Sequence, residues 1–390
     1  MTQTAEQTRI DRVALVGAVV ALAGATVLPF VELRPNRLVP GAMHGFAAAG
    51  PWAFAVWALV AMGFTAAFLR GVKARLVAGS VSAIGIVAAL SWALGSAADT
   101  LLAGQAPVSR VSMGAGVWVM LAGAAILGFA GQERTHRVLW RLVAAAVVLV
   151  ALFGAFHLGG LERISLVREF EVRASSFWGL LGNHLALASA GVGLGVMFGV
   201  PLGLLATRNR RARGVVLGVT GVIQTVPSLA LLGLLIVPLS ALSQAVPALR
   251  AIGVHGIGAA PGLVALTLYA LLPVVRNTYV GLSGVDPAAV DAGLGMGMSR
   301  GQLLMRVEFP LALPLIIEGV RTASVLLIGI TTLTAFAGAR NLGVLIIEGL
   351  GQFAPDLILL GALPTIMLAV AADSALSAVG RAVTPEGVRT

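Results

Sequence analysis

The stretch VDPAAVDAGLGMGMSRGQLLMRVEFPLALP, residues 285–314, is a moderately polar island between two long apolar segments. It predicts two short helices joined by a glycine turn. Asp286 is a good N-cap for the first helix, and Pro287 fits its first position, where a missing N–H costs nothing. Ser299 and Gln302 have the spacing of a capping box, which predicts the start of the second helix.

Glycines and prolines set the expected ends of these two helices. Gly293, Gly295 and Gly297 are expected to break the first helix, because glycine is a poor helix former and permits left-handed turns. Pro310 and Pro314 are expected to end the second helix and to restart the chain as a membrane segment. An ordinary connecting loop is the alternative interpretation of the whole stretch.

The composition of the chain indicates a polytopic membrane protein. Of its 390 residues, 58% are hydrophobic and 11% are charged, and the mean hydropathy is +0.98. A soluble domain carries about 25% charged residues. The chain has no cysteine, which excludes disulfides and thiolate metal sites. The net charge of +10 does not indicate nucleic-acid binding, because the arginines lie between apolar runs, where they set membrane orientation.

About ten segments are apolar and long enough to cross a membrane, since a helical span needs about 20 residues. The candidates are 13–31, 51–69, 76–98, 113–130, 142–159, 184–206, 215–238, 259–282, 311–338 and 357–380. Most basic residues then fall on the side that holds the N-terminus, which predicts that both termini and the 285–314 island are cytoplasmic. The expected fold is an all-α membrane protein with about ten transmembrane helices.

The chain divides near residue 160 into two halves of different texture. All six tryptophans lie before residue 180, and the five spans expected within residues 1–159 carry almost no polar chemistry, so this extension receives no function. Residues 160–183 are expected to lie outside, either as an amphipathic helix on the membrane surface or as a plain linker. Residues 381–390 are expected to form a cytoplasmic tail.

A polar interruption in the second half is one candidate for a substrate path. Gln224, Thr225, Pro227 and Ser228 lie inside an expected span. A proline there frees a backbone carbonyl, and neighbouring hydroxyls can satisfy it. The alternative interpretation is a structural kink buried between helices.

An ionisable pair is the second candidate for the path. Glu318 and Arg321 lie three residues apart within one expected span and therefore share a helix face. Ionisable residues inside spans are expensive and often mark transport pathways. Mutual pairing or snorkelling towards the membrane surface explains them equally well.

The sequence lacks the motifs of an enzyme. A P-loop needs a Gly-Lys-Ser/Thr sequence, but the only lysine, Lys73, is followed by Ala74. The five histidines show no metal-binding spacing, and no nucleophile elbow occurs in a plausible context. We therefore expect a non-catalytic chain that itself binds neither ATP nor a metal ion.

The 285–314 island resembles the cytoplasmic loop of ABC importer permeases. That family's pattern is Glu-Ala-Ala, three residues, Gly, nine residues, then Ile-x-Leu-Pro, and here Asp291 stands first and the spacing is intact. The resemblance implies that the island is an ATPase-coupling loop. Its implied site residues are Asp291, Ala292, Gly293, Gly297, Ser299, Arg300, Val307 and Pro310.

The resemblance extends over residues 184–380, which are similar to the five-helix permease core. Several stretches look like the glycine betaine, choline and osmoprotectant branch of the family. They are PLGLLATR at 201–208, QTVPSLALLGLL at 224–235, LYALLPVVRNTYVGL at 268–282, GMGMSR at 295–300 and PLALPLIIEGVRTA at 310–323. The long N-terminal half resembles the long-permease subclass of that branch.

The resemblance implies a mechanism in a bacterial inner membrane. The chain would pair with a second permease, identical or related, and two ATPase subunits would bind inside and hold the ATP. A substrate-binding protein would deliver glycine betaine, choline or carnitine from outside. The coupling loop would transmit closure of the ATPase to the membrane helices.

Other functions remain compatible with the sequence. The cargo of the same kind of permease could be an amino acid or another small polar solute. A secondary transporter is a different class, and such proteins often contain paired inverted repeats, whereas the two halves here differ in tryptophan content and glycine texture. A membrane enzyme or scaffold is disfavoured by the missing catalytic motifs.

Overall fold

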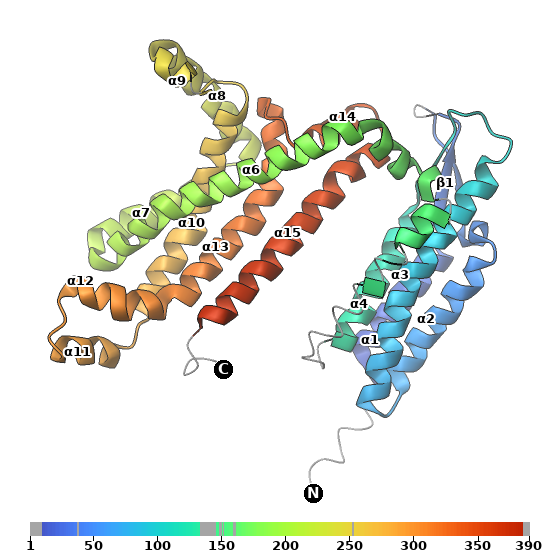
Figure 1. Ribbon diagram of the computed structural model, residues 1–390, viewed down its shortest axis with the longest axis horizontal. Helices are drawn as coiled ribbons and strands as arrows, with labels where there is room; N and C mark the ends of the chain where they lie inside the picture. Colours follow the sequence, from blue (N-terminus) through green and yellow to red (C-terminus); the bar gives the residue numbers. More distant parts are fainter. Residues whose placement is uncertain are drawn as a thin grey trace, which may run out of the picture. The chain divides into compact units, whose positions relative to one another are not determined.

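The computed structural model describes residues 10–36, 39–132, 146–147, 150, 152–158, 161–251 and 253–384. The chain forms two compact units (Figure 1). The first unit consists of residues 1–172 together with 352–356, and the second of residues 173–351 and 357–390. Of the span expected at 142–159, residues 146–147, 150 and 152–158 are described, and they are helical; the others lie outside the described residues.

The first unit is a helical bundle with a small antiparallel sheet. Strand β1 lies between β2 and β3. The strands are β1 Val31–Arg34, β2 Ala42–His44 and β3 Arg110–Met113, and the helices are α1 Arg12–Thr26, α2 Trp52–Phe68, α3 Val72–Leu102 and α4 Ala115–Gln132, with 3-10 turns at Phe46–Ala49 and Leu161–Arg163. The sheet was not expected from the sequence, because strands of three or four residues are too short to show a clear period of two.

The regular elements of the second unit, within its described residues, are all helices, with no strands. Its helices are α6 Ser165–Arg208, which begins in the first unit, α7 Arg210–Thr225, α8 Ser228–Ala245, α9 Pro247–Ala251, α10 Ala259–Ser283, α11 Pro287–Gly295, α12 Arg300–Leu303, α13 Phe309–Thr331, α14 Gly343–Gly351 and α15 Pro355–Val383. A π-helical turn, η3 Leu304–Glu308, joins α12 to α13, and a 3-10 turn, η4 Thr332–Ala337, follows α13.

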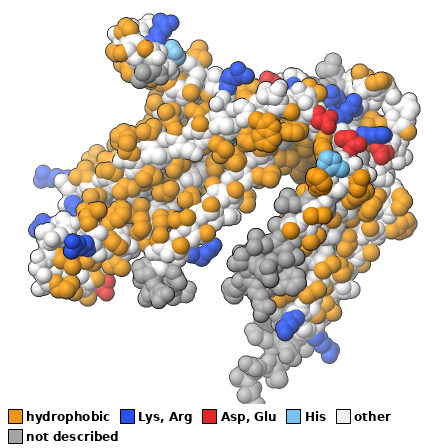
Figure 2. All heavy atoms as spheres, viewed as in Figure 1, with side chains coloured by type: hydrophobic (Ala, Val, Ile, Leu, Met, Phe, Trp, Pro, Cys, Tyr) orange, Lys and Arg blue, Asp and Glu red, His pale blue; other side chains and the backbone are white. Residues whose placement is uncertain are grey.

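The prediction of a polytopic membrane protein is confirmed. Six described helices are long and apolar enough to cross a membrane, and three shorter apolar helices belong to the first unit. Figure 2 shows hydrophobic side chains over the visible sides of α6, α13 and α15. Two expectations differ in detail. The span at 215–238 is divided between α7 and α8, and most of 160–183 is the beginning of the uninterrupted helix α6.

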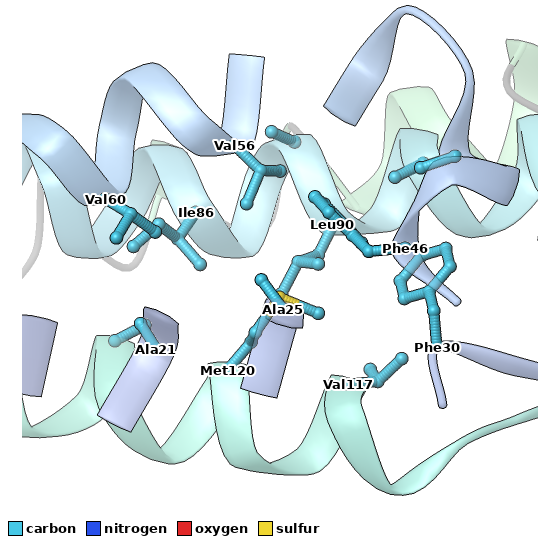
Figure 3. Packing of buried hydrophobic residues seen from close by; sticks show 14 of the residues in the cluster. Ala21, Ala25, Phe30, Phe46, Val56, Val60, Ile86, Leu90, Val117 and Met120 are labelled. Atoms are coloured by element: carbon cyan, nitrogen blue, oxygen red, sulfur yellow. The ribbon is translucent and has the colours of Figure 1, made fainter. Parts of the chain in front are cut away.

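Small residues allow the helices of the first unit to pack closely. A Cβ atom on Gly24 of α1 would lie 2.8 Å from the backbone of Gly116 and Met120 on α4. At the sheet end, the rings of Phe30 and Phe46 meet edge to face with centroids 4.9 Å apart. Figure 3 shows Met120 among the buried side chains of this core.

A row of glycines on α6 sets the packing of the second unit. Gly195, Gly199 and Gly203 recur every four residues and so share one helix face, which lies against α10. A Cβ atom on Gly199 would lie 2.8 Å from Val274 Cγ1, and one on Gly203 would lie 2.6 Å from Thr278 Cβ. Small residues let helix backbones approach closely in membranes, where dispersion contacts replace the hydrophobic effect between helices.

We predict that Gly195→Leu destabilises the second unit by about 1–3 kcal/mol, because the new side chain must displace α10 at Ala270. Gly193→Leu is the matched control, since nothing lies within 4 Å of a Cβ atom at Gly193. Thermal unfolding of the two variants in the same detergent measures the difference. Equal melting temperatures would show that this glycine face does not control packing.

Candidate functional site

The 285–314 loop has the predicted helix–turn–helix structure. Asp286 caps α11, and its Oδ1 accepts a hydrogen bond from the Ala288 N–H at 2.9 Å. The capping box at α12 is complete: Ser299 Oγ accepts from the Gln302 N–H at 3.3 Å, and Gln302 Oε1 accepts from the Ser299 N–H at 2.8 Å. Gly297 has a φ of +80°, which is the left-handed turn between the helices. These local predictions are confirmed.

The expected role of Gly293 is wrong, whereas that of Gly295 is confirmed. Gly293 lies inside α11, and Gly295 is the last residue of that helix; neither has a positive φ. Gly293 is buried, and a Cβ atom there would lie 2.6 Å from Leu303 Cδ1 and 3.7 Å from Val307 Cγ2. Its lack of a side chain therefore serves close packing of α11 on the next helix. The helix ends at Gly295, and the left-handed turn follows at Gly297.

The expectation that Pro310 and Pro314 end the second helix is also wrong. Helix α12 continues through the π turn η3 into α13, and the Phe309 N–H donates to the Leu304 carbonyl five residues earlier. Pro310 then occupies the first turn of α13, where a helix tolerates a residue without an N–H. Pro314 lies within α13. The loop and the membrane helix are thus one continuous rod.

An ion pair fixes the inner end of this rod. Glu308 is only 6% exposed and pairs with Arg208, the last residue of α6. Around the pair, Ile316 and Leu282 form a buried cluster against which Phe309 packs. Sequence reasoning did not assign a role to Glu308. A carboxylate directly before Phe-Pro in an apolar context is the signal that could have identified it, because buried carboxylates require a partner.

The tip of the loop is open and partly apolar. Leu294, Met296 and Met305 are 48%, 71% and 66% exposed. Of the other predicted loop residues, Asp291, Ala292, Ser299, Arg300 and Pro310 are exposed, and Val307 is half-buried. Basic side chains, all arginines in this unit, are visible at the end of the second unit formed by α11 and α12 (Figure 2). Exposed apolar residues on a polar end of a molecule indicate an interaction site.

The break between α7 and α8 is the first of the two proposed substrate-path sites. Val226 is extended there, and Pro227 directly precedes α8. Gln224 Nε2 donates to the Tyr269 carbonyl at 3.2 Å, and Tyr269 Oη donates to the Val226 carbonyl at 2.6 Å. The predicted interruption of the helix is confirmed, and the side chains of Gln224 and Tyr269 link the break to α10 by hydrogen bonds.

The remaining groups at this break lie at its edge. Thr225 Oγ1 is exposed and donates to the Val222 carbonyl at 2.7 Å, while Ser228 begins α8. Tyr269, contributed by α10, was missed by sequence reasoning, because only its fold places it beside a segment 43 residues away.

The ionisable pair is part of a group of three charges. Arg321 of α13 forms two hydrogen bonds to Asp373 of α15, at 2.7 and 3.1 Å, and also contacts Glu318 Oε2 at 3.1 Å. The predicted pairing of Glu318 with Arg321 is present, and Asp373 was missed. The sequence does contain a signal for Asp373, because an acidic residue inside the last apolar segment requires a partner. The group carries one positive and two negative charges and is partly exposed.

No cluster of three or more histidine, aspartate or glutamate side chains in the described residues could hold a metal ion. The candidate sites are the 285–314 loop with its exposed apolar tip and the polar groups within apolar helices.

Comparison with known proteins gives two family matches. Residues 11–167 match the family described as "ABC transporter permease YehY, N-terminal domain", and residues 199–385 match "Binding-protein-dependent transport system inner membrane component". The second match includes the 285–314 loop, the break at Pro227 and the three charges.

Curated relatives are similar over about half of the chain. It is 39% identical to the glycine betaine/carnitine/choline transport system permease protein OpuCB of Bacillus subtilis, covering 53% of this chain and 88% of the relative. It is 40% identical to the osmoprotectant import permease protein OsmW of Salmonella typhimurium, covering 53% and 91%. Among solved structures, the MetNI methionine ABC transporter in an inward-facing conformation matches 56% of this chain and 99% of its own, with 21% identity and a TM-score of 0.47.

We predict opposite effects for two alanine substitutions in the loop. Gly297→Ala places a Cβ atom at a φ of +80° and destabilises the turn by about 1–2 kcal/mol. Gly301→Ala, in the helical backbone of α12 with open space around it, stabilises the helix by up to about 1 kcal/mol. Hydrogen exchange of the Met298 and Gln302 amides measures both. Slower exchange in Gly297→Ala would contradict the assigned turn.

Proposed function

The chain belongs to the family of binding-protein-dependent transport system inner membrane components, and we propose that it is the transmembrane subunit of an ATP-driven importer of a small osmoprotectant. The cargo we propose is glycine betaine, choline or carnitine, the solutes named in its relatives. The observation that carries the proposal is the capped loop of α11 and α12, which is rigidly continuous with α13 and exposes an apolar tip.

The tip of the loop is the proposed docking site for an ATPase subunit. Leu294 and Met296 are exposed at the point where α11 ends, and Gly297 turns the chain back beside them. A groove on the ATPase that covers these side chains would bury apolar surface that is otherwise in water. This chain would bind no cofactor itself, and ATP would be held and hydrolysed by the partner.

Two connections support transmission of a push from the loop. The backbone is helical from α12 through η3 into α13, so displacement of the tip acts directly on a membrane helix. The ion pair between Glu308 and Arg208 ties the same point to the end of α6. Packed elements respond to such displacements as rigid bodies, which is the usual basis of domain-scale switching.

The proposed orientation places the loop and both termini in the cytoplasm. The support is the distribution of basic residues, including the arginines at the beginning of α7 and in the loop. A substrate-binding protein would then dock on the opposite side, and a second permease, identical or related, would complete the path. The proposed permease core is residues 184–380, preceded by the five-span extension.

The proposed path includes two polar sites of the second unit. Glu318, Arg321 and Asp373 are partly exposed although they lie within apolar helices. Charged groups at such positions face water or another protein in preference to lipid. The second site is the break from Gln224 to Ser228, where Thr225 has its hydroxyl at an exposed edge.

We expect purified complexes in vesicles to hydrolyse ATP faster when glycine betaine, choline or carnitine is present with the binding protein. Methionine and histidine test the alternative of an amino-acid cargo. If only an amino acid stimulates hydrolysis, the proposed cargo is wrong, but the proposal that the chain is part of an ATP-driven importer still holds. Uptake driven by an ion gradient without ATP would instead indicate a secondary transporter and overturn the proposal.

In the same preparation, Leu294→Asp with Met296→Asp should prevent recovery of the ATPase with the permease.

The control for this loop variant is Ile257→Asp. Ile257 is 69% exposed and lies just before α10, away from the loop in the sequence. It places an aspartate on an exposed apolar position, as each of the two loop substitutions does, and recovery of the ATPase should be unchanged. Equal recovery from the loop variant would show that the tip is not the docking site.

We predict that Arg321→Gln lowers uptake by about tenfold or more, because it leaves two carboxylates without their cation within apolar helices. Adding Asp373→Asn removes one of these carboxylates and should recover part of the uptake. Arg381→Gln, near the end of α15, is the control and should change uptake little. Uptake that is lower in the double variant than in Arg321→Gln would contradict the pairing.

A further inference from the structure

The first unit contains a short piece of the distant end of the chain. Residues 352–356, which connect α14 to α15 and include the first two residues of α15, belong to this unit by their contacts. Ala354 and Asp356 are buried, at 2% and 5% exposed. Asp356 lies in the first turn of α15, so the beginning of that helix is part of the first unit's packed structure.

A buried ionic cluster holds Asp356. Arg110 of β3 lies 3.7 Å from its carboxylate, and Ser165 at the beginning of α6 donates a hydrogen bond to Asp356 Oδ2. Arg110 also forms an ion pair with Glu169, one turn further along α6, which is 1% exposed. Separating Asp356 from this group is unfavourable, because its buried carboxylate would lose both its cation and its hydrogen-bond donor.

A second contact holds the residues just before the cluster. Phe353 has a φ of +51°, and among the described residues it is the only non-glycine residue with a positive φ. Arg34 of β1 donates to the Phe353 carbonyl at 3.3 Å and is itself oriented by Glu32, to which its Nη2 donates at 3.0 Å. A strained backbone conformation persists only when surrounding contacts hold it. Here Arg34 holds the Phe353 carbonyl, and three residues later the ionic cluster holds Asp356.

We infer that the N-terminal unit is a fixed anchor for the beginning of α15. Three elements of that unit, β1, β3 and the first turns of α6, hold residues 352–356 by charge and hydrogen bonds. Helix α15 then continues past Asp373, which lies roughly 25 Å along the helix from Asp356 at 1.5 Å per residue. With one end held, α15 can tilt about that end, and its displacement grows towards Asp373. Anchoring α15 is thus the function that we infer for the N-terminal extension. Of the measurements that test it, only uptake rests on the proposed import function.

The natural absence of cysteine allows a direct test of the anchor. Ser165→Cys with Asp356→Cys replaces the hydrogen bond by a pair of thiols that oxidation or a short bifunctional thiol reagent can bridge. With the thiols reduced, we expect uptake to fall about tenfold, since a hydrogen bond to a charged group is lost. Bridging, verified by mass spectrometry of the joined peptides, should restore it.

Two results would overturn the inference. If the bridged protein is inactive and the reduced protein is active, the contact must open during transport and is not a fixed anchor. If uptake equals that of the parent in both states, the contact has no role in transport. Hydrogen exchange of the amides in 352–356 is the readout that does not depend on uptake, and it should be fast when reduced and slow when bridged. An inactive parent protein would refute the import function and leave this exchange test valid.

An exposed ion pair of the same unit provides the matched control. Arg163 and Asp99 lie 3.1 Å apart, with both side chains about half exposed. Exposed pairs contribute about 0–1 kcal/mol. Asp99→Cys with Arg163→Cys should therefore leave uptake and the exchange of 352–356 unchanged, whether reduced or oxidised.

Discussion

The need to satisfy backbone hydrogen bonds in apolar surroundings constrains the whole of this chain. Helices meet that need internally, and each interruption requires a substitute partner. At the break before α8, the Tyr269 hydroxyl provides one for the Val226 carbonyl. Ahead of Pro310, the π turn takes the Phe309 N–H to Leu304. After α13, the buried Asn341 donates to Thr334 at 2.8 Å and accepts from the Gly343 N–H at 2.7 Å. At each of these three irregular segments, nearby polar groups thus provide the hydrogen bonds that a regular helix would otherwise supply.

The same apolar environment determines where charge can be placed. Glu308 and Glu169 are both buried, and each is paired with an arginine from another element. Within the membrane helices α13 and α15, Arg321 joins two carboxylates. Apart from Glu318–Arg321 within α13, each pair links segments that are distant in the sequence, so it also fixes one element against another. Ionic contacts here act at the connections between helices, while the glycine faces set how closely the helices approach.

Local features of the loop could be predicted from the sequence, and long-range ones could not. The caps at Asp286 and Ser299 depend on residues two or three positions away, so the pattern itself contains the information. The role of Gly293 depends on Leu303, which only the folded turn brings against it. Arg208 and Glu308 are 100 residues apart, and Arg321 and Asp373 are 52 apart. A single sequence can mark Glu308 and Asp373 as unusual, but it does not show which arginine each contacts, and the resemblance to a family predicted the loop without these partners.

The π turn at Leu304–Glu308 has a consequence for how this loop can vary. A π turn is equivalent to one extra residue in an α-helix, and a residue rotates about 100° around the helix axis. The face that α12 presents at the loop tip and the face that α13 presents to α10 are therefore offset by that one residue. Loss of a single residue here would turn the tip about 100° relative to the membrane helix and leave both helices intact. Chain length in this turn, more than its composition, sets the direction in which the loop points.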